Sequence, residues 1–81
     1  MKAECIESLI ECNREIEFTY KGKRYSITYY NDKREKYISV GEFYGKFVDV
    51  KNSSEVLKLK IGNLTLEQIF AKLPDSAFDI Y

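Results

Sequence analysis

The sequence has no histidine and no tryptophan, and it has one proline and two cysteines among its 81 residues. Without histidine, Ser-His and Cys-His nucleophile pairs and histidine-ligated metal sites are excluded. The four glycines stand singly, so no glycine-rich phosphate-binding loop is present. These absences predict a protein that is not an enzyme and that holds no cofactor and no metal ion.

The two cysteines, Cys5 and Cys12, lie in a stretch with helical periodicity. Seven residues of helix rise about 10 Å, which is beyond the reach of a disulfide. We expect both to be buried free thiols, as is typical of a reducing cytoplasm. No long apolar run predicts a membrane span, and residues 1–16 lack the pattern of a signal peptide. The sequence therefore predicts a cytoplasmic protein.

Aromatic and charged residues are plentiful. Aromatic residues make up 15% of the chain, seven of them tyrosines, and charged residues make up 32% with a net charge of zero. This composition excludes a disordered chain, and the length predicts one domain, residues 1–81. The charges are unevenly distributed, because residues 1–20 are acidic and residues 21–36 are basic.

The hydrophobic pattern of the first half predicts a helix followed by a hairpin. Apolar residues recur at helical spacing over residues 3–14, with glutamates on the other side. The period then changes to two over residues 16–20 and 25–30, on either side of a short loop that contains Gly22. This arrangement is typical of a β-hairpin. A third strand is expected from Lys36 to Val40, with an extension towards Tyr44.

The second half predicts short helices. Residues 47–50 are expected to form either a fourth strand or a packed connection. Asn52 and Glu55 resemble a capping box that opens a helix ending at Gly62. Thr65 and Gln68 form a second capping box, whose helix stops before Pro74. We therefore predict an α+β fold with an N-terminal helix, a three- to four-stranded antiparallel sheet, and one or two short C-terminal helices packed on one face.

Exposed tyrosines are the first candidate binding feature. Tyr20, Tyr25 and Tyr29 are expected to point into the core, and Tyr30 to point the other way. Tyr37 and Tyr44 would lie on opposite faces of one regular strand over residues 37–44, so at least one of them is expected to be exposed, beside Phe43 or Phe47. Tyrosine supplies a large contact area at low entropic cost, so these residues predict a protein interface. The alternative is that a small domain fills a thin core with amphipathic aromatic residues.

Two charged features provide further candidates. Glu4, Glu7 and Glu11 form an acidic stripe on the predicted first helix, which Glu15 extends if the helix reaches that far. Such a stripe is either a solvated face or a short imitation of a phosphate backbone. The basic residues form two clusters at opposite ends of the predicted sheet, at positions 21, 23 and 24 and at positions 33, 34 and 36. Basic residues that lie beside aromatic residues can bind single-stranded nucleic acid, although the net charge of this chain is zero.

Two segments carry a resemblance to known proteins. They are the run from Glu15 to Ile27, EIEFTYKGKRYSI, and the run from Ile61 to Phe70, IGNLTLEQIF. The chain resembles small uncharacterised proteins of low-GC Gram-positive bacteria, their phages and other mobile elements. The resemblance implies an accessory protein that acts by stoichiometric binding, including inhibition of host defence systems. It assigns no function to any single residue.

These features predict a small protein-binding module, and the short sheet suggests self-association as a homodimer through an edge strand. The predicted contact residues are Tyr30, Tyr37, Tyr44, Phe43, Glu4, Glu7 and Glu11. One alternative is a nucleic-acid-binding protein that uses the basic turns and exposed tyrosines. Another is an oligomer that sequesters a small anion between subunits. The pattern of residues predicts no membrane partner.

Overall fold

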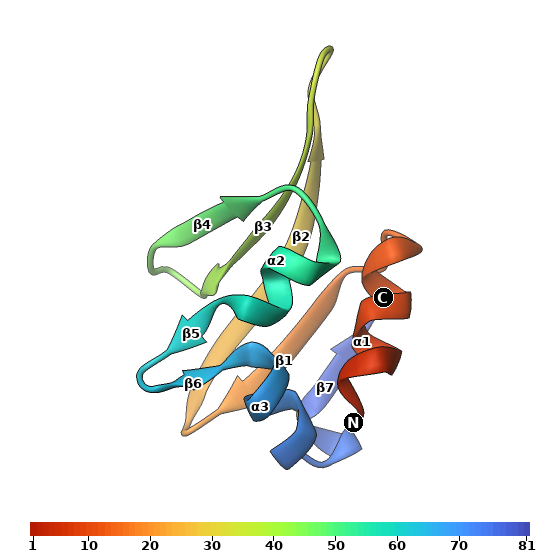
Figure 1. Cartoon of the computed structure of the whole chain (residues 1–81). Helices are drawn as coiled ribbons and strands as arrows, with labels where there is room; N and C mark the ends of the chain where they lie inside the picture. The colour runs from red at the N-terminus through yellow and green to blue at the C-terminus, as the bar shows by residue number, and fades with distance from the viewer.

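The computed structural model describes residues Met1–Tyr81 and shows an α+β fold, as predicted. Three helices are present, α1 (Ala3–Glu11), α2 (Ser53–Lys58) and α3 (Leu66–Lys72), together with a 3₁₀ turn at Asp75–Ala77. The strands are β1 (Ile16–Tyr20), β2 (Lys23–Asn31), β3 (Lys36–Glu42), β4 (Phe47–Val50), β5 (Lys60–Ile61), β6 (Leu64–Thr65) and β7 (Phe78–Ile80). The helices lie on one side of the main sheet (Figure 1).

The main sheet has five antiparallel strands in the order β4-β3-β2-β1-β7, one more than the largest number predicted. Residues 47–50 form the strand at one edge. The strand at the other edge comes from the C-terminal tail, where Phe78 pairs with Phe18 and Ile80 pairs with Ile16. Five strands therefore cover a core that a three-stranded sheet would leave open at both edges.

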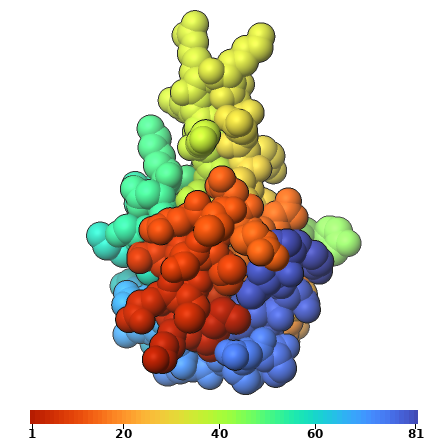
Figure 2. All heavy atoms as spheres, turned by 90° about the vertical axis from the view of Figure 1, so that its right-hand side faces the viewer, coloured from red at the N-terminus to blue at the C-terminus, as the bar shows by residue number.

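The two hairpins of the sheet differ in length. Lys21 and Gly22 connect β1 to β2 with φ angles of 50° and 76°, the left-handed pair that a type I′ turn requires. The β2–β3 hairpin is longer, and its tip projects beyond the rest of the molecule as an arm (Figures 1 and 2). Residues 30–36 of this arm are all exposed.

The core lies between the sheet and the helices. Phe18 has no exposed surface, and its ring stacks on Tyr25 and meets Phe70 edge-on, with centroids 5.2 and 5.1 Å apart. Ile6 and Ile10 of α1 join this cluster. The predicted inward tyrosines behave as expected, because Tyr25 is buried while Tyr20 and Tyr29 are partly buried and pack against the core.

The first helix is shorter than predicted. It ends at Glu11 because Asn13 adopts a left-handed φ of 57°, with Asn13 N bonded to Ile10 O and Arg14 N bonded to Leu9 O. This is a Schellman ending. Glu15 therefore lies outside the helix and does not extend the acidic stripe.

The prediction that both cysteines are buried is wrong, because Cys5 and Cys12 are exposed. The short helix buries a narrow stripe, of which only Ile6 and Ile10 are fully enclosed. Cys5 lies on the flank of this stripe, and Cys12 follows the last helical residue. The free thiols are thus surface groups.

Side-chain caps determine where α2 and α3 begin. Thr65 and Gln68 form the predicted reciprocal capping box of α3. Asn52 accepts from the Glu55 backbone N at 2.9 Å, but the Glu55 carboxylate accepts from Lys51 N rather than completing a box with Asn52. The predicted extent of α2 is also wrong, since α2 stops at Lys58. The next residues form the β5–β6 hairpin, in which Gly62 takes a left-handed φ of 64°.

Candidate functional site on the open face of the sheet

The five-stranded sheet has one covered face and one open face. Side chains alternate along each strand, so the residues between the core positions point away from the helices. In β2 these are Arg24, Ser26, Thr28 and Tyr30. Thr28 lies opposite Ser39, which in turn lies opposite Asp49. The open face therefore extends across β2, β3 and β4.

The centre of the open face is hollowed. Ser26, Thr28 and Ser39 contribute its floor, and Ser39 is only 3% exposed although no helix covers it. These side chains are small, so their larger neighbours shade them from solvent. The residues that line this open-face hollow are Ser26, Thr28, Tyr30, Asn31, Asp32, Tyr37, Ser39, Phe47 and Asp49.

Aromatic residues form the walls of the open-face hollow. Tyr30 and Tyr37 are cross-strand partners at the base of the arm, and Tyr30 is 59% exposed. Phe47, which is 44% exposed, stands on the edge strand β4 opposite Gly41. A Cβ at Gly41 would lie 2.9 Å from the Phe47 ring and 2.4 Å from the Lys46 carbonyl oxygen. Glycine at this position therefore lets the Phe47 ring lie close over β3.

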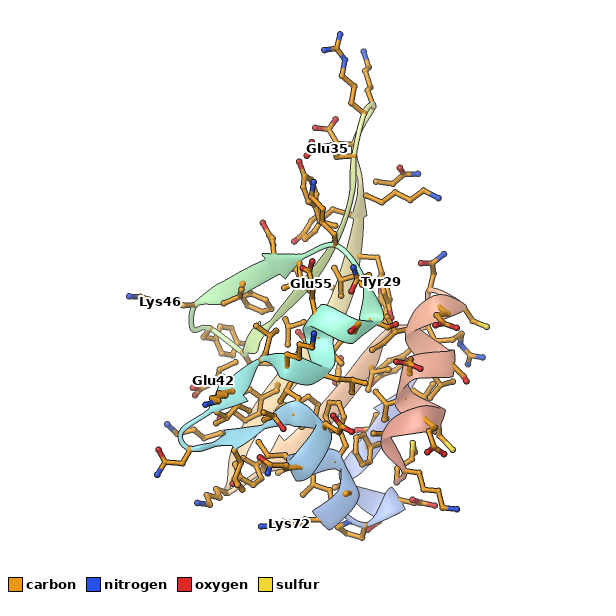
Figure 3. All side chains as sticks on the ribbon, in the orientation of Figure 1. Tyr29, Glu35, Glu42, Lys46, Glu55 and Lys72 are labelled. Atoms are coloured by element: carbon orange, nitrogen blue, oxygen red, sulfur yellow. The ribbon has the colours of Figure 1, made fainter.

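The open-face hollow is acidic. Asp32 and Asp49 line it, and no lysine or arginine does. Glu35, labelled on the arm in Figure 3, accepts a hydrogen bond from the Tyr37 hydroxyl. This bond, followed by burial, raises the pKa of Tyr37 above its ordinary value. The hydroxyl of Tyr37 is thus directed towards Glu35, which does not itself line the hollow.

An ion cluster lies on the same face, beside the hollow. Arg24 donates to Glu17 at 3.0 Å and also to Asp79, and it donates to the hydroxyl of Thr19 at 2.9 Å. The bonds to Asp79 and then to Glu17 raise the pKa of Arg24 above its usual value. Because both carboxylates are occupied with this one cation, the cluster ties β7 to β1 and β2 and adds no positive charge to the face.

The structure brings only some of the predicted contact residues together. Tyr30 and Tyr37 share the open-face hollow. Phe43 and Tyr44 do not line it, because β3 ends at Glu42 and both lie in the turn before β4. The strand thus extends two residues beyond Val40 and stops short of Tyr44. Tyr44 is fully exposed, with a left-handed φ of 62°.

The acidic stripe stands apart from the hollow. Glu4, Glu7 and Glu11 lie on α1, which packs against α2 and α3 on the covered side of the sheet. None of the three pairs with a lysine or arginine, and Glu11 accepts from the Ser53 hydroxyl at 3.5 Å. The two surfaces that the sequence offered as alternatives are thus separate in space.

Sequence reasoning missed part of the hollow. Asp49 and the hydroxyl floor were not identified, although the alternation within β2 and β3 already puts Ser26, Thr28 and Ser39 on the face of Tyr30 and Tyr37. Asp49 joins them only because β4 pairs with β3, which the sequence left undecided. The hollow is therefore a product of strand order as well as of alternation.

Comparison with known proteins adds no relative. No family model, curated protein or solved structure matches the chain. The structure also gathers no group of three or more histidine, cysteine, aspartate or glutamate side chains that would hold a metal ion. None of its helices has the length and apolar character needed to cross a bilayer.

Proposed function

We propose that this chain is a small non-catalytic protein-binding module that contacts its partner through the open face of the sheet. The observation that carries the proposal is the open-face hollow, in which exposed aromatic walls surround a floor of hydroxyl groups. Interfaces are enriched in tyrosine and other aromatic residues, which offer apolar area together with a polar tip. The hydroxyls of Ser26, Thr28 and Ser39 add donors and acceptors for a polar partner segment.

The charge of the hollow specifies the chemistry of the partner. Asp32 and Asp49 line it, and no lysine or arginine is among its lining residues. Complementarity therefore favours a partner surface that presents lysine or arginine side chains, which also stack favourably on the faces of Tyr30 and Tyr37. The resemblance to phage and mobile-element proteins suggests a stoichiometric inhibitor of a host defence component as the biological form of this binding.

A selection from yeast-displayed random peptides tests the proposal. We expect the recovered peptides to be rich in lysine, arginine and apolar residues. Titrated into isotope-labelled protein, they should shift the amide signals of β2, β3 and β4. Tyr30→Ala and Phe47→Ala should each weaken binding by about tenfold, the effect of losing a typical interface anchor.

Tyr81→Ala is the matched control, because Tyr81 is 60% exposed, about the same as Tyr30 at 59%, and does not line the hollow. Its peptide affinities should equal those of the wild type. Peptides that shift the amides of α1, or that bind equally well to Tyr30→Ala and Phe47→Ala, would show that the open face is not the contact surface. Peptides without an excess of basic residues would contradict the predicted partner chemistry.

A further inference from the structure

Three turns meet at the end of the sheet opposite the arm. They are the β1–β2 turn, the β3–β4 turn and the β5–β6 hairpin. The hydrogen bond from Phe43 N to Arg24 O, at 2.9 Å, holds the first two together. Two neighbouring hollows here share Lys23, Tyr25 and Ile61, so they form one continuous groove along the three turns. We call this the loop-end groove.

The loop-end groove has a basic rim. Four exposed lysines line it: Lys21 and Lys23 come from the β1–β2 hairpin, Lys46 from the β3–β4 turn and Lys60 from β5. Only Lys23 has a carboxylate partner, Glu42 at 3.9 Å. Figure 3 shows Glu42 and Lys46 on the side of the molecule where β5 and β6 lie. The folded chain thus adds Lys46 and Lys60 to a basic cluster that in the sequence contains only the residues of the first turn.

Aromatic and apolar surface accompanies these charges. Tyr20 lies in the groove, with the Lys21 ammonium 5.4 Å from its ring centroid. Leu59, Ile61 and Leu64 are partly buried and line the groove beneath the lysines. Tyr44 shares the β3–β4 turn with Lys46, and its only close aromatic neighbour is Phe43, edge-on with the centroids 6.4 Å apart.

We propose that the loop-end groove binds single-stranded nucleic acid without regard to sequence. A row of lysines with adjacent aromatic and apolar platforms matches how single strands are held, with phosphates on the cations and bases on the rings. The cations are all lysines, which act as point charges on phosphate, and the aromatic and apolar platforms offer a stacking surface for bases, which an acidic peptide does not have. These observations favour a nucleic acid over an acidic peptide. The site is independent of the open-face hollow, which lies on another surface of the sheet.

Fluorescence anisotropy with a short labelled oligothymidine provides the test. Binding should weaken with salt, because each contacted phosphate contributes about −0.7 to the slope of log affinity against log salt for single strands. Lys46→Gln combined with Lys60→Gln should weaken binding by roughly tenfold and make the slope shallower by about 1.4. Tyr44→Ala should also cost roughly tenfold, the effect of losing one stacked base.

Two controls match these variants. Lys33→Gln with Arg34→Gln removes the same charge from the arm tip, and Tyr81→Ala removes an exposed tyrosine elsewhere. Both should bind the oligonucleotide as the wild type does. An equal loss of affinity in the arm-tip variant would show that binding depends only on the overall charge of the protein. It would overturn the assignment of binding to the loop-end groove. If oligoglutamate binds as tightly as oligothymidine, the groove recognises an acidic protein and not a nucleic acid, which contradicts the proposal. If no oligonucleotide binds at low salt, the proposal is wrong.

Discussion

The two faces of the main sheet are made from the same strands but have opposite characters. On the covered face β2 presents Tyr25 and Ile27 to the helices, and on the open face the same strand presents Ser26 and Thr28. Alternation thus lets nine residues of one strand supply both the core and a candidate contact surface. The stability of the fold therefore depends on one set of positions, while the other set is free to be selected for recognition.

The largest expected difference comes from truncating one aromatic residue on each face. Phe18→Ala should lower the free energy of unfolding by about 3–5 kcal/mol, because it removes a fully buried ring that contacts three other aromatic rings. Tyr30→Ala should change it by no more than about 0.5 kcal/mol, since Tyr30 is mostly exposed. Urea denaturation followed by circular dichroism measures both values.

Since a small domain has a total stability of only about 5 kcal/mol, a loss of this size leaves little folded protein to measure. Phe18→Leu is then the second variant, with a smaller loss in the same direction. Equal losses of unfolding free energy for the variants at positions 18 and 30 would contradict the view that the covered face stabilises the fold while the open face is free for recognition.

The second largest effect is expected at Gly41, an open-face position that is constrained by packing. Gly41→Ala should cost about 1–3 kcal/mol, since its Cβ would lie 2.4 Å from the Lys46 carbonyl oxygen and 2.8 Å from Phe47 Cα. Gly45→Ala is the matched control, with its nearest contacts at 3.3 Å, and should cost less. Chemical denaturation of the two variants side by side checks the order. If Gly45→Ala is the more damaging, the close approach of β4 to Gly41 is not a constraint on the fold.

Local patterns predicted most of the fold. The β1–β2 hairpin follows from alternating residues around Gly22, and α3 follows from the Thr65–Gln68 box, because both signals act between neighbouring residues. The fifth strand was not predicted, since Phe78 pairs with Phe18 across 60 residues of sequence. The burial of the cysteines was predicted wrongly because periodicity alone does not tell how wide a stripe of a short helix the core encloses.

The candidate site was predictable to a smaller extent. The outward direction of Tyr30 follows from the regular alternation of β2, and the structure agrees. The place of Tyr44 in a turn was not predicted, because the chain leaves β3 after Glu42 and Tyr44 itself adopts a left-handed φ. The lysines of the loop-end groove come from three separate segments, and no pattern within one segment indicates that tertiary packing brings them together.

The smallest expected effect concerns Tyr29, a covered-face residue at the margin of the helical layer. Its hydroxyl donates to Arg14 O at 2.6 Å. Burial first, and the Glu15 carboxylate second, raise the pKa of Tyr29 to about 12. The unfolded chain loses this proton near pH 10, so the contribution of Tyr29 to stability is complete below about pH 10 and declines as the pH rises towards 12.

Tyr29→Phe isolates this contribution. At neutral pH the variant should be less stable by about 1 kcal/mol, because it lacks the hydrogen bond to Arg14 O. Urea denaturation of both proteins from neutral pH to about pH 12 should show the difference shrinking above about pH 10, since only the wild type has this proton to lose. All other groups are common to both proteins, so their contributions cancel in the comparison. A constant difference would mean that Tyr29 titrates normally in the fold, and the margin of the covered face would then be as accessible to water as the open face.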